Sequence, residues 1–266
     1  KAVIAAVVGV AVTLTAFFYL RYTENEQAHE ALETEAYSLQ RDIRQSLVSH
    51  LFVAELLARE WERSEINLSS RRSADADIVT LYYPNVQNVV WLDDSQTIQF
   101  LYPRNEQTAL VGSVFSGSSL NAQLSQSQNN RHAMMGYAGN LGQLSSDIAI
   151  FVRVQRSDTP GFLGFIISLQ SMFNNVIRTN ISEGFQVSIS NDSGVLYEFA
   201  GDPSLKDDWT HSRRLQVVGN SWELSVWPTT EHMSDLRGAV SVAVLLAGLF
   251  ITAALTFVLY ILGQSR

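Results

Sequence analysis

Hydrophobic residues gather in two long uncharged runs near the ends of the chain, and polar residues are interspersed only in the stretch between them. The first run covers residues 2–20 and the second covers residues 238–263. A bilayer core about 30 Å thick is crossed by roughly 20 helical residues. Inside lipid, a helix satisfies every backbone N–H and C=O within its own segment. We therefore predict transmembrane helices over residues 1–21 and 237–263, with the intervening segment on one side of the membrane.

The first run has two interpretations, an uncleaved anchor or a cleaved signal peptide. It is longer than the roughly 7–15 apolar residues of a signal-peptide core. It ends in the aromatic cluster Phe17, Phe18 and Tyr19, which is typical of a membrane interface. We favour the anchor. Small residues four positions apart allow two helices to pack closely, although alanine is also common on faces that contact lipid. Such pairs are Ala2 and Ala6, Ala5 and Gly9, and Ala243 and Ala247.

Residues 22–63 predict one continuous stalk helix, since they are rich in Glu, Gln, Ala, Leu and Arg and contain no Gly or Pro. A heptad frame places mostly apolar residues on one seam, with Ser46 and His50 as polar breaks. Two interpretations stay open: a dimeric coiled-coil contact, or an amphipathic face packed on the helix's own domain. The candidate stalk and dimer residues on this seam are Leu32, Leu39, Ile43, His50, Val53 and Leu57.

Beyond residue 63 the pattern changes to short strands. Five segments have the composition of strands, and the stretch 116–130 between the second and third predicts a short helix and a loop. This is the order of a PAS-like fold. The five segments are 86–93, 97–103, 132–139, 147–155 and 161–170.

A second, smaller set of elements follows: a helix over 171–181, strands over 184–190 and 194–199, and a hairpin over 213–228 that turns at Gly219 and Asn220. The predicted class is α+β. A long N-terminal helix precedes two PAS-like antiparallel modules, and two transmembrane helices flank them. We place the membrane-distal module at residues 64–170 and the membrane-proximal module at 171–231.

Residues 85–112 contain a strand ending in Trp91-Leu92-Asp93, a second ending in Tyr102-Pro103, and Gly112 at a fitting distance. With segments 161–177 and 221–229, they resemble the CHASE family of extracellular sensor domains, and Cache-class sensors end similarly. The resemblance implies a two-module periplasmic or extracellular domain. It also implies a small ligand in the distal module and regulation of a cytoplasmic histidine kinase or diguanylate cyclase.

The segment between the runs is acidic, because its 14 Lys and Arg face all 26 Asp and Glu, giving a formal charge of −12. Nucleic acid is therefore excluded as a partner, since it needs a basic surface. The five histidines are dispersed, and no spacing matches a nucleophile, phosphate or metal motif. We expect no enzyme activity, cofactor or metal in this chain.

A ligand-binding pocket is a better hypothesis than a catalytic site. Because side chains alternate between the two faces of a strand, residues that share a face are the candidates to line it. Two guanidinium groups, Arg104 and Arg153, are candidates to clamp a carboxylate, and Asp147 is a candidate acceptor. Ordinary core packing or an ion pair would explain the same residues. The complete candidate set is Phe100, Tyr102, Arg104, Met134, Asp147, Phe151 and Arg153.

The predicted protein is thus the sensory part of a homodimeric two-pass receptor in a bacterial inner membrane, in contact with the lipid bilayer. The alternative is a periplasmic protein-interaction module, or an accessory subunit of a membrane complex, without a small ligand. A solvent-accessible cavity at Tyr102, Phe151 and Arg153 would favour sensing.

Overall fold

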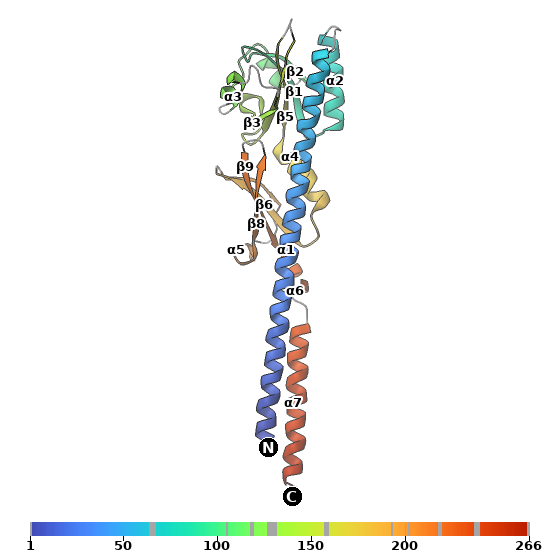
Figure 1. Ribbon diagram of the computed structural model, residues 1–266, viewed down its shortest axis with the longest axis vertical. Helices are drawn as coiled ribbons and strands as arrows, with labels where there is room; N and C mark the ends of the chain where they lie inside the picture. Colours follow the sequence, from blue (N-terminus) through green and yellow to red (C-terminus); the bar gives the residue numbers. More distant parts are fainter. Residues whose placement is uncertain are drawn as a thin grey trace.

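The computed structural model describes residues 2–63, 68–104, 106–117, 120–126, 132–156, 160–192, 194–199, 201, 203–217, 220–236 and 240–264. The molecule is long and narrow, with helix α1 (Ala2–Arg63) extending along most of its length (Figure 1). Two antiparallel sheets pack along the upper part of α1, and helix α7 (Val240–Gln264) lies beside its lower part. The predicted α+β class and element plan are confirmed.

The distal module is built on a five-stranded antiparallel sheet in the order β2-β1-β5-β4-β3. Short helices η1 (Glu106–Leu110), α3 (Leu120–Gln126) and η2 (Gly139–Leu141) lie in its connections. The predicted five strands, and the helix after the second strand, are present. The strands are β1 (Val86–Asp93), β2 (Ile98–Tyr102), β3 (Met134–Tyr137), β4 (Ile148–Val154) and β5 (Gly161–Ile167).

Both faces of this sheet are covered, and β4 and β5 are buried along their whole length. Alternate residues such as Ile150 and Phe165 belong to the core shared with α1, whereas Phe151 and Phe162 pack beneath α3 on the other face. A strand buried on both faces needs apolar residues at every position. This is why β4 and β5 are nearly continuous apolar runs in the sequence.

The proximal module begins with α4 (Leu169–Asn180), whose first turn is capped by the Ser168 hydroxyl, which accepts a bond from the Ser171 N–H at 3.2 Å. Its sheet has the order β7-β6-β9-β8. The predicted turn at Gly219 lies outside the described residues. The strands are β6 (Phe185–Asn191), β7 (Gly194–Phe199), β8 (His211–Val217) and β9 (Asn220–Pro228), accompanied by α5 (Lys206–Trp209) and α6 (Thr230–Leu236).

The buried stripe of α1 repeats every 11 residues, through Ala28, Leu39, His50 and Trp61. Eleven residues in three turns is close to the α-helical period, whereas a heptad seam drifts off a straight helix face by about 20° per heptad. The stripe packs against the two modules of the same chain. Of the two interpretations left open, this region of the helix therefore follows the second, packing on its own domain.

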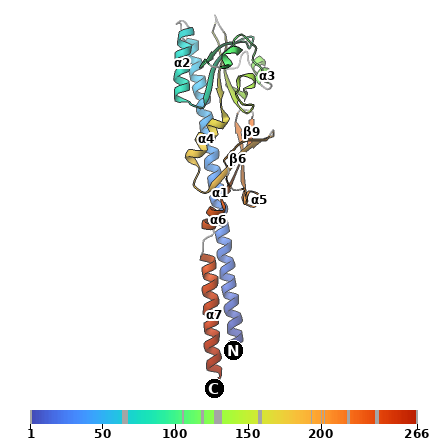
Figure 2. The ribbon, with the colours of Figure 1, turned by 180° about the vertical axis from the view of Figure 1, so that it is seen from behind.

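The longest helix that was not predicted lies just after α1. Helix α2 (Leu68–Tyr82) occupies a stretch where short strands were expected to begin, and it lies beside the top of α1 (Figure 2). It is held there by tertiary contacts: the Trp61 indole donates to Asp75 at 2.8 Å, and the Arg72 guanidinium lies 4.3 Å above the Trp91 ring. Its weak local amphipathicity explains why the sequence pattern missed it.

The lower parts of α1 and α7 are long and apolar enough to cross a membrane. They meet through two reciprocal contacts, because a Cβ on Gly9 would lie 2.6 Å from the Thr252 side chain and one on Gly248 would lie 2.5 Å from that of Thr13. Close approach at glycine is typical of transmembrane helix pairs. Ala243 and Ala247 are instead exposed, away from α1.

Candidate functional site

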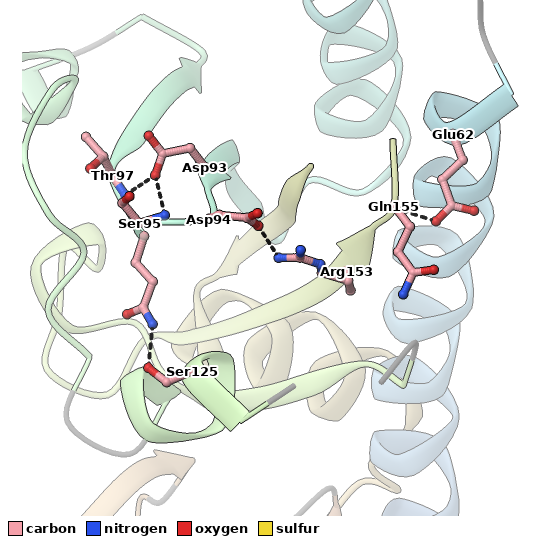
Figure 3. A network of polar contacts seen from close by, with 9 residues as sticks. Glu62, Asp93, Asp94, Ser95, Thr97, Ser125, Arg153 and Gln155 are labelled. Carbon is pink, nitrogen blue, oxygen red and sulfur yellow. Dashed lines mark hydrogen bonds and ion pairs between the residues drawn. The ribbon is translucent and has the colours of Figure 1, made fainter. Parts of the chain in front are cut away.

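A network of polar contacts lies at the far end of the distal sheet (Figure 3). Its centre is Arg153, near the end of β4, which is buried and forms an ion pair with Asp94 in the β1–β2 turn. The guanidinium also lies 4.7 Å above the Phe162 ring, while its buried Nε makes no hydrogen bond within the described chain. Arg153 therefore retains one unused donor in a desolvated position.

The β1–β2 turn is rigid, because Asp93 organises it. One carboxylate oxygen accepts bonds from the backbone N–H groups of Ser95 and Thr97, both at 2.9 Å. Gln96 adopts a left-handed conformation (φ 60°), and its amide donates to the Ser125 hydroxyl at 2.9 Å. The turn thereby holds α3 against the sheet beside Arg153 (Figure 3).

The end of β4 is also bonded to the top of α1. The backbone N–H of Gln155 donates to the Glu62 carboxylate at 2.8 Å (Figure 3). The Arg156 guanidinium donates to the Trp61 carbonyl at 3.1 Å. Because α1 is one unbroken helix from Ala2 to Arg63, the residues that contact this strand end and the first apolar run belong to the same helix.

The predicted ligand residues Phe100 and Tyr102 lie on the face of the sheet that packs towards α1. Both are half-buried, and the Tyr102 hydroxyl donates to Asp77 of α2 at 2.7 Å. This hydrogen bond to a carboxylate raises the pKa of Tyr102. Arg104, just beyond β2, is exposed.

Met134 and Phe151 lie on the opposite face, in the core beneath α3, where Phe151 packs edge-on against Phe115 at 5.1 Å. Asp147 lies just before β4 and is fully buried. One of its oxygens accepts from the Leu144 N–H at 2.8 Å, and the other has no partner within the described chain.

The structure thus separates the predicted set into groups that do not face one cavity. Phe100 and Tyr102 are on the α1 side, whereas Met134, Phe151 and Arg153 are on the α3 side. Asp147 and Arg153 are six residues apart along one strand, or about 20 Å at 3.3 Å per residue. The predicted carboxylate clamp of Arg104 and Arg153 stays a prediction: Arg104 is exposed, whereas Arg153 is buried and paired with Asp94. Whether either group binds a ligand stays a prediction.

The hollows in the structure do not coincide with the cavity that was predicted at Tyr102, Phe151 and Arg153. Four hollows of about 110–500 Å³ occur among the described residues, and Tyr102 and Phe151 line none of these four; Arg153 lines the smallest. The α3 side of the sheet is instead filled by apolar side chains: Phe115, Leu120, Leu124, Met134, Phe151 and Phe162.

The predicted stalk residues fall into two groups by burial. Leu32, Leu39, Ile43 and His50 are buried against the protein's own modules. Val53 and Leu57 are only half-buried, as expected once the heptad frame drifts from the 11-residue stripe. A dimer contact through these positions stays a prediction.

Sequence patterns missed Asp94, Gln96 and Glu62, which complete the polar network. Each is a polar residue in a turn or at a helix end, where such residues are common. Only the meeting of the β1–β2 turn, the end of β4 and the top of α1 distinguishes them.

No protein-family model and no curated protein sequence matches this chain. Solved structures do match. The ligand-binding domain of the Pseudomonas aeruginosa amino-acid chemoreceptor PctB, in complex with L-Arg, is 13% identical with a TM-score of 0.53, over 78% of this chain and 97% of that one. A domain of a protein described as sensory box/GGDEF family from Vibrio parahaemolyticus matches at 11% identity and TM-score 0.52, over 79% and 98%.

The extracellular domain of a protein described as histidine kinase vpHK1S-Z8 matches at 12% identity and TM-score 0.50, over 80% of this chain and 94% of that one. An extracellular ligand-binding receptor from Desulfohalobium retbaense DSM5692 matches at 13% identity and TM-score 0.48, over 76% of this chain and 39% of that receptor. The three matches with TM-scores of 0.50 or above show that most of this chain shares the fold of these sensory and ligand-binding domains.

Proposed function

We propose that this chain is the sensing and transmembrane part of a receptor that binds a small molecule in its distal module. The observation that carries the proposal is the bonding of strand β4 to α1. The strand that holds Arg153 ends on Glu62, and the same helix continues into the first apolar span. The fold shared with ligand-binding sensory domains supports this reading.

The proposed ligand site lies between β4 and α3, at either polar end of the strand. Arg153 offers an unused Nε donor at one end, and Asp147 offers an unpartnered oxygen at the other. Because apolar side chains fill the space between them, ligand entry requires α3 to move away from the sheet. A small molecule bearing a carboxylate suits the Arg153 end, and one bearing an amino group suits the Asp147 end.

Binding shifts the receptor only by the difference in ligand affinity between its two states. In this proposal, outward movement of α3 loosens the Gln96–Ser125 bond and displaces the turn that carries Asp94. Arg153 then repositions the end of β4, and Glu62 passes that shift to α1. The output would be a histidine kinase or diguanylate cyclase, in a CHASE-type receptor of a bacterial inner membrane, with no enzyme activity in the segment described here.

A thermal-shift screen of the full chain in detergent, against amino acids and other small metabolites, tests ligand binding. We expect at least one compound to raise the melting temperature of the wild type. One of the two variants Arg153→Gln and Asp147→Asn should lose this increase, and that variant identifies the end of β4 at which the compound binds. The exposed substitution Val195→Ser, on β7, is the matched control and should keep the full shift. A well-folded sample that no compound stabilises would count against direct sensing.

A second candidate function, protein docking, is favoured by exposed apolar side chains on the outer faces of α1 and α2. Phe52 is 64% exposed and Leu81 is 71% exposed, on two helices that lie side by side in both views (Figures 1 and 2). We propose that a second copy of the chain covers this outer stripe and makes the receptor a homodimer. The stripe consists of Val48, Phe52, Leu56, Ile78, Leu81 and Tyr82.

A further inference from the structure

A hollow of about 500 Å³ lies between α1 and β8 in the proximal module, far from the polar network. Strand β8 is the edge of its sheet, and the Gln40 side-chain amide donates to the Arg214 carbonyl at 2.8 Å, which joins this edge to α1. We call this the arginine hollow. Its polar and aromatic lining comprises Tyr37, Gln40, Arg41, Arg44, Arg214 and Gln216.

Three arginines line the arginine hollow, Arg41, Arg44 and Arg214, and only the first has an ion-pair partner within the described chain. Arg41 contacts its neighbour Asp42 at 3.2 Å, but Arg44 and Arg214 make no side-chain hydrogen bond or ion pair within the described chain. Glu223 is opposite Arg214 in the β8–β9 register, yet the two side chains form no ion pair. Two arginines without an ion-pair partner, Arg44 and Arg214, thus line the same hollow.

The adjacent Arg213, unlike Arg44 and Arg214, has a carboxylate partner within the chain. Its guanidinium forms an ion pair with Glu33 at 3.1 Å and lies 5.2 Å above the Tyr37 ring. Three of the 14 basic residues between the spans, Arg41, Arg44 and Arg214, therefore line this hollow, although that segment has a formal charge of −12. A concentration of cations against the sign of the whole segment indicates a specific anionic partner.

The location decides what kind of anion can reach the hollow. The first apolar run ends at Leu20, and at a rise of about 1.5 Å per residue Tyr37 lies roughly 26 Å, and Arg44 roughly 36 Å, further along α1. Lipid headgroups occupy only a thin layer outside the hydrocarbon core, so they do not reach this height. The anion that binds in the arginine hollow must therefore be a soluble one.

We propose that the arginine hollow binds a soluble multivalent oxyanion, a phosphate compound or a di- or tricarboxylate. Planar guanidinium forks bind both carboxylate and phosphate in bidentate geometry. Gln216 adds an amide donor, and the Tyr37 ring forms an aromatic wall. Because the occupant bridges α1 and the edge of the proximal sheet, it stabilises the native contact between them and acts as an input separate from the distal site.

Isothermal titration of the full chain in detergent, in low-salt buffer free of phosphate, tests this site with pyrophosphate and citrate as probes. Acetate at matched ionic strength is the monovalent control. We expect saturable binding of at least one probe, and that probe identifies the preferred chemistry. Arg44→Gln and Arg214→Gln should each weaken it about tenfold or more, the loss expected for one charge-assisted hydrogen bond.

The matched control is Arg59→Gln, on an exposed position of the same helix outside the hollow. It should leave the affinity unchanged. Arg44→Lys keeps the charge without the planar fork and should bind with intermediate affinity, provided that circular dichroism shows an unchanged fold. The proposal is overturned if neither probe binds, if acetate produces the same heat, or if Arg59→Gln weakens binding as much as Arg214→Gln.

Discussion

The carboxylate of Glu24 on α1 accepts two hydrogen bonds from Ser241 near the start of α7, from its backbone N–H at 3.2 Å and from its hydroxyl at 2.9 Å. Both residues are buried, and Arg21 lies 3.5 Å from the same carboxylate. This contact lies directly beyond the first apolar run. It fixes the height of one membrane-spanning helix relative to the other.

Removing this carboxylate should therefore destabilise the helix pair. Glu24→Ala leaves the Ser241 N–H buried without an acceptor, and we expect a loss of about 1–3 kcal/mol in the free energy of unfolding. Denaturant titration in detergent micelles measures it. With Ser241→Ala and the double variant, a double-mutant cycle isolates the pair; strictly additive losses would mean that the two side chains do not interact.

Close packing between the spans gives a second prediction. A side chain at Gly248 collides with Thr13, so Gly248→Val should separate the helices and lower the unfolding free energy by about 1–3 kcal/mol. Ala247→Val, one residue earlier and exposed, is the control. Thermal unfolding in micelles compares the two variants. Equal melting temperatures would contradict the proposed contact.

His50 makes the stability of the stalk depend on pH. Its Nδ1 lies 2.7 Å from the Ser46 carbonyl, its Nε2 has no partner within the described chain, and burial lowers its pKa below the ordinary 6.5. The unfolded state therefore binds more protons below pH 6.5 than the folded state does. Stability is complete above pH 6.5 and falls as the pH drops towards the folded-state pKa.

His50→Gln should remove that contribution, because glutamine does not titrate. We expect the unfolding free energy of the wild type to decline more steeply than that of the variant between pH 7.5 and 5, measured by denaturant titration at each pH. The other four histidines are common to both proteins. Parallel pH profiles would show that His50 does not titrate in this range.

The outer stripe on α1 and α2 predicts the oligomeric state. Phe52→Glu combined with Leu81→Glu places two charges in the proposed dimer contact, so light scattering in detergent should report a monomer where the wild type gives a dimer. Val195→Glu introduces a charge at an exposed position on β7 and should leave the dimer intact. A wild type that is monomeric at high concentration would contradict the proposal and favour a different protein partner.

Much of the architecture was predictable because it follows local patterns. Strands β4 and β5 are continuous apolar runs, and α1 lacks helix-breaking residues from Tyr22 to Arg63. Helix α2 was missed because Trp61 and Trp91 hold it through Asp75 and Arg72, contacts that no short window contains. The ligand candidates were selected by alternation along each strand, which identifies a shared face but not what covers that face.

The sequence by itself determined the two apolar spans, the order of the strands, and the acidic character of the segment between the spans, since each depends on composition or on a period of a few residues. Tertiary structure decided which face each residue occupies, because burial depends on neighbours far apart in the chain. It brought Arg153 to Asp94 and Glu62 to the end of β4, and it gathered three arginines around one hollow. Ionic and hydrogen-bond partners are set by distance in space, which no periodicity in the sequence encodes.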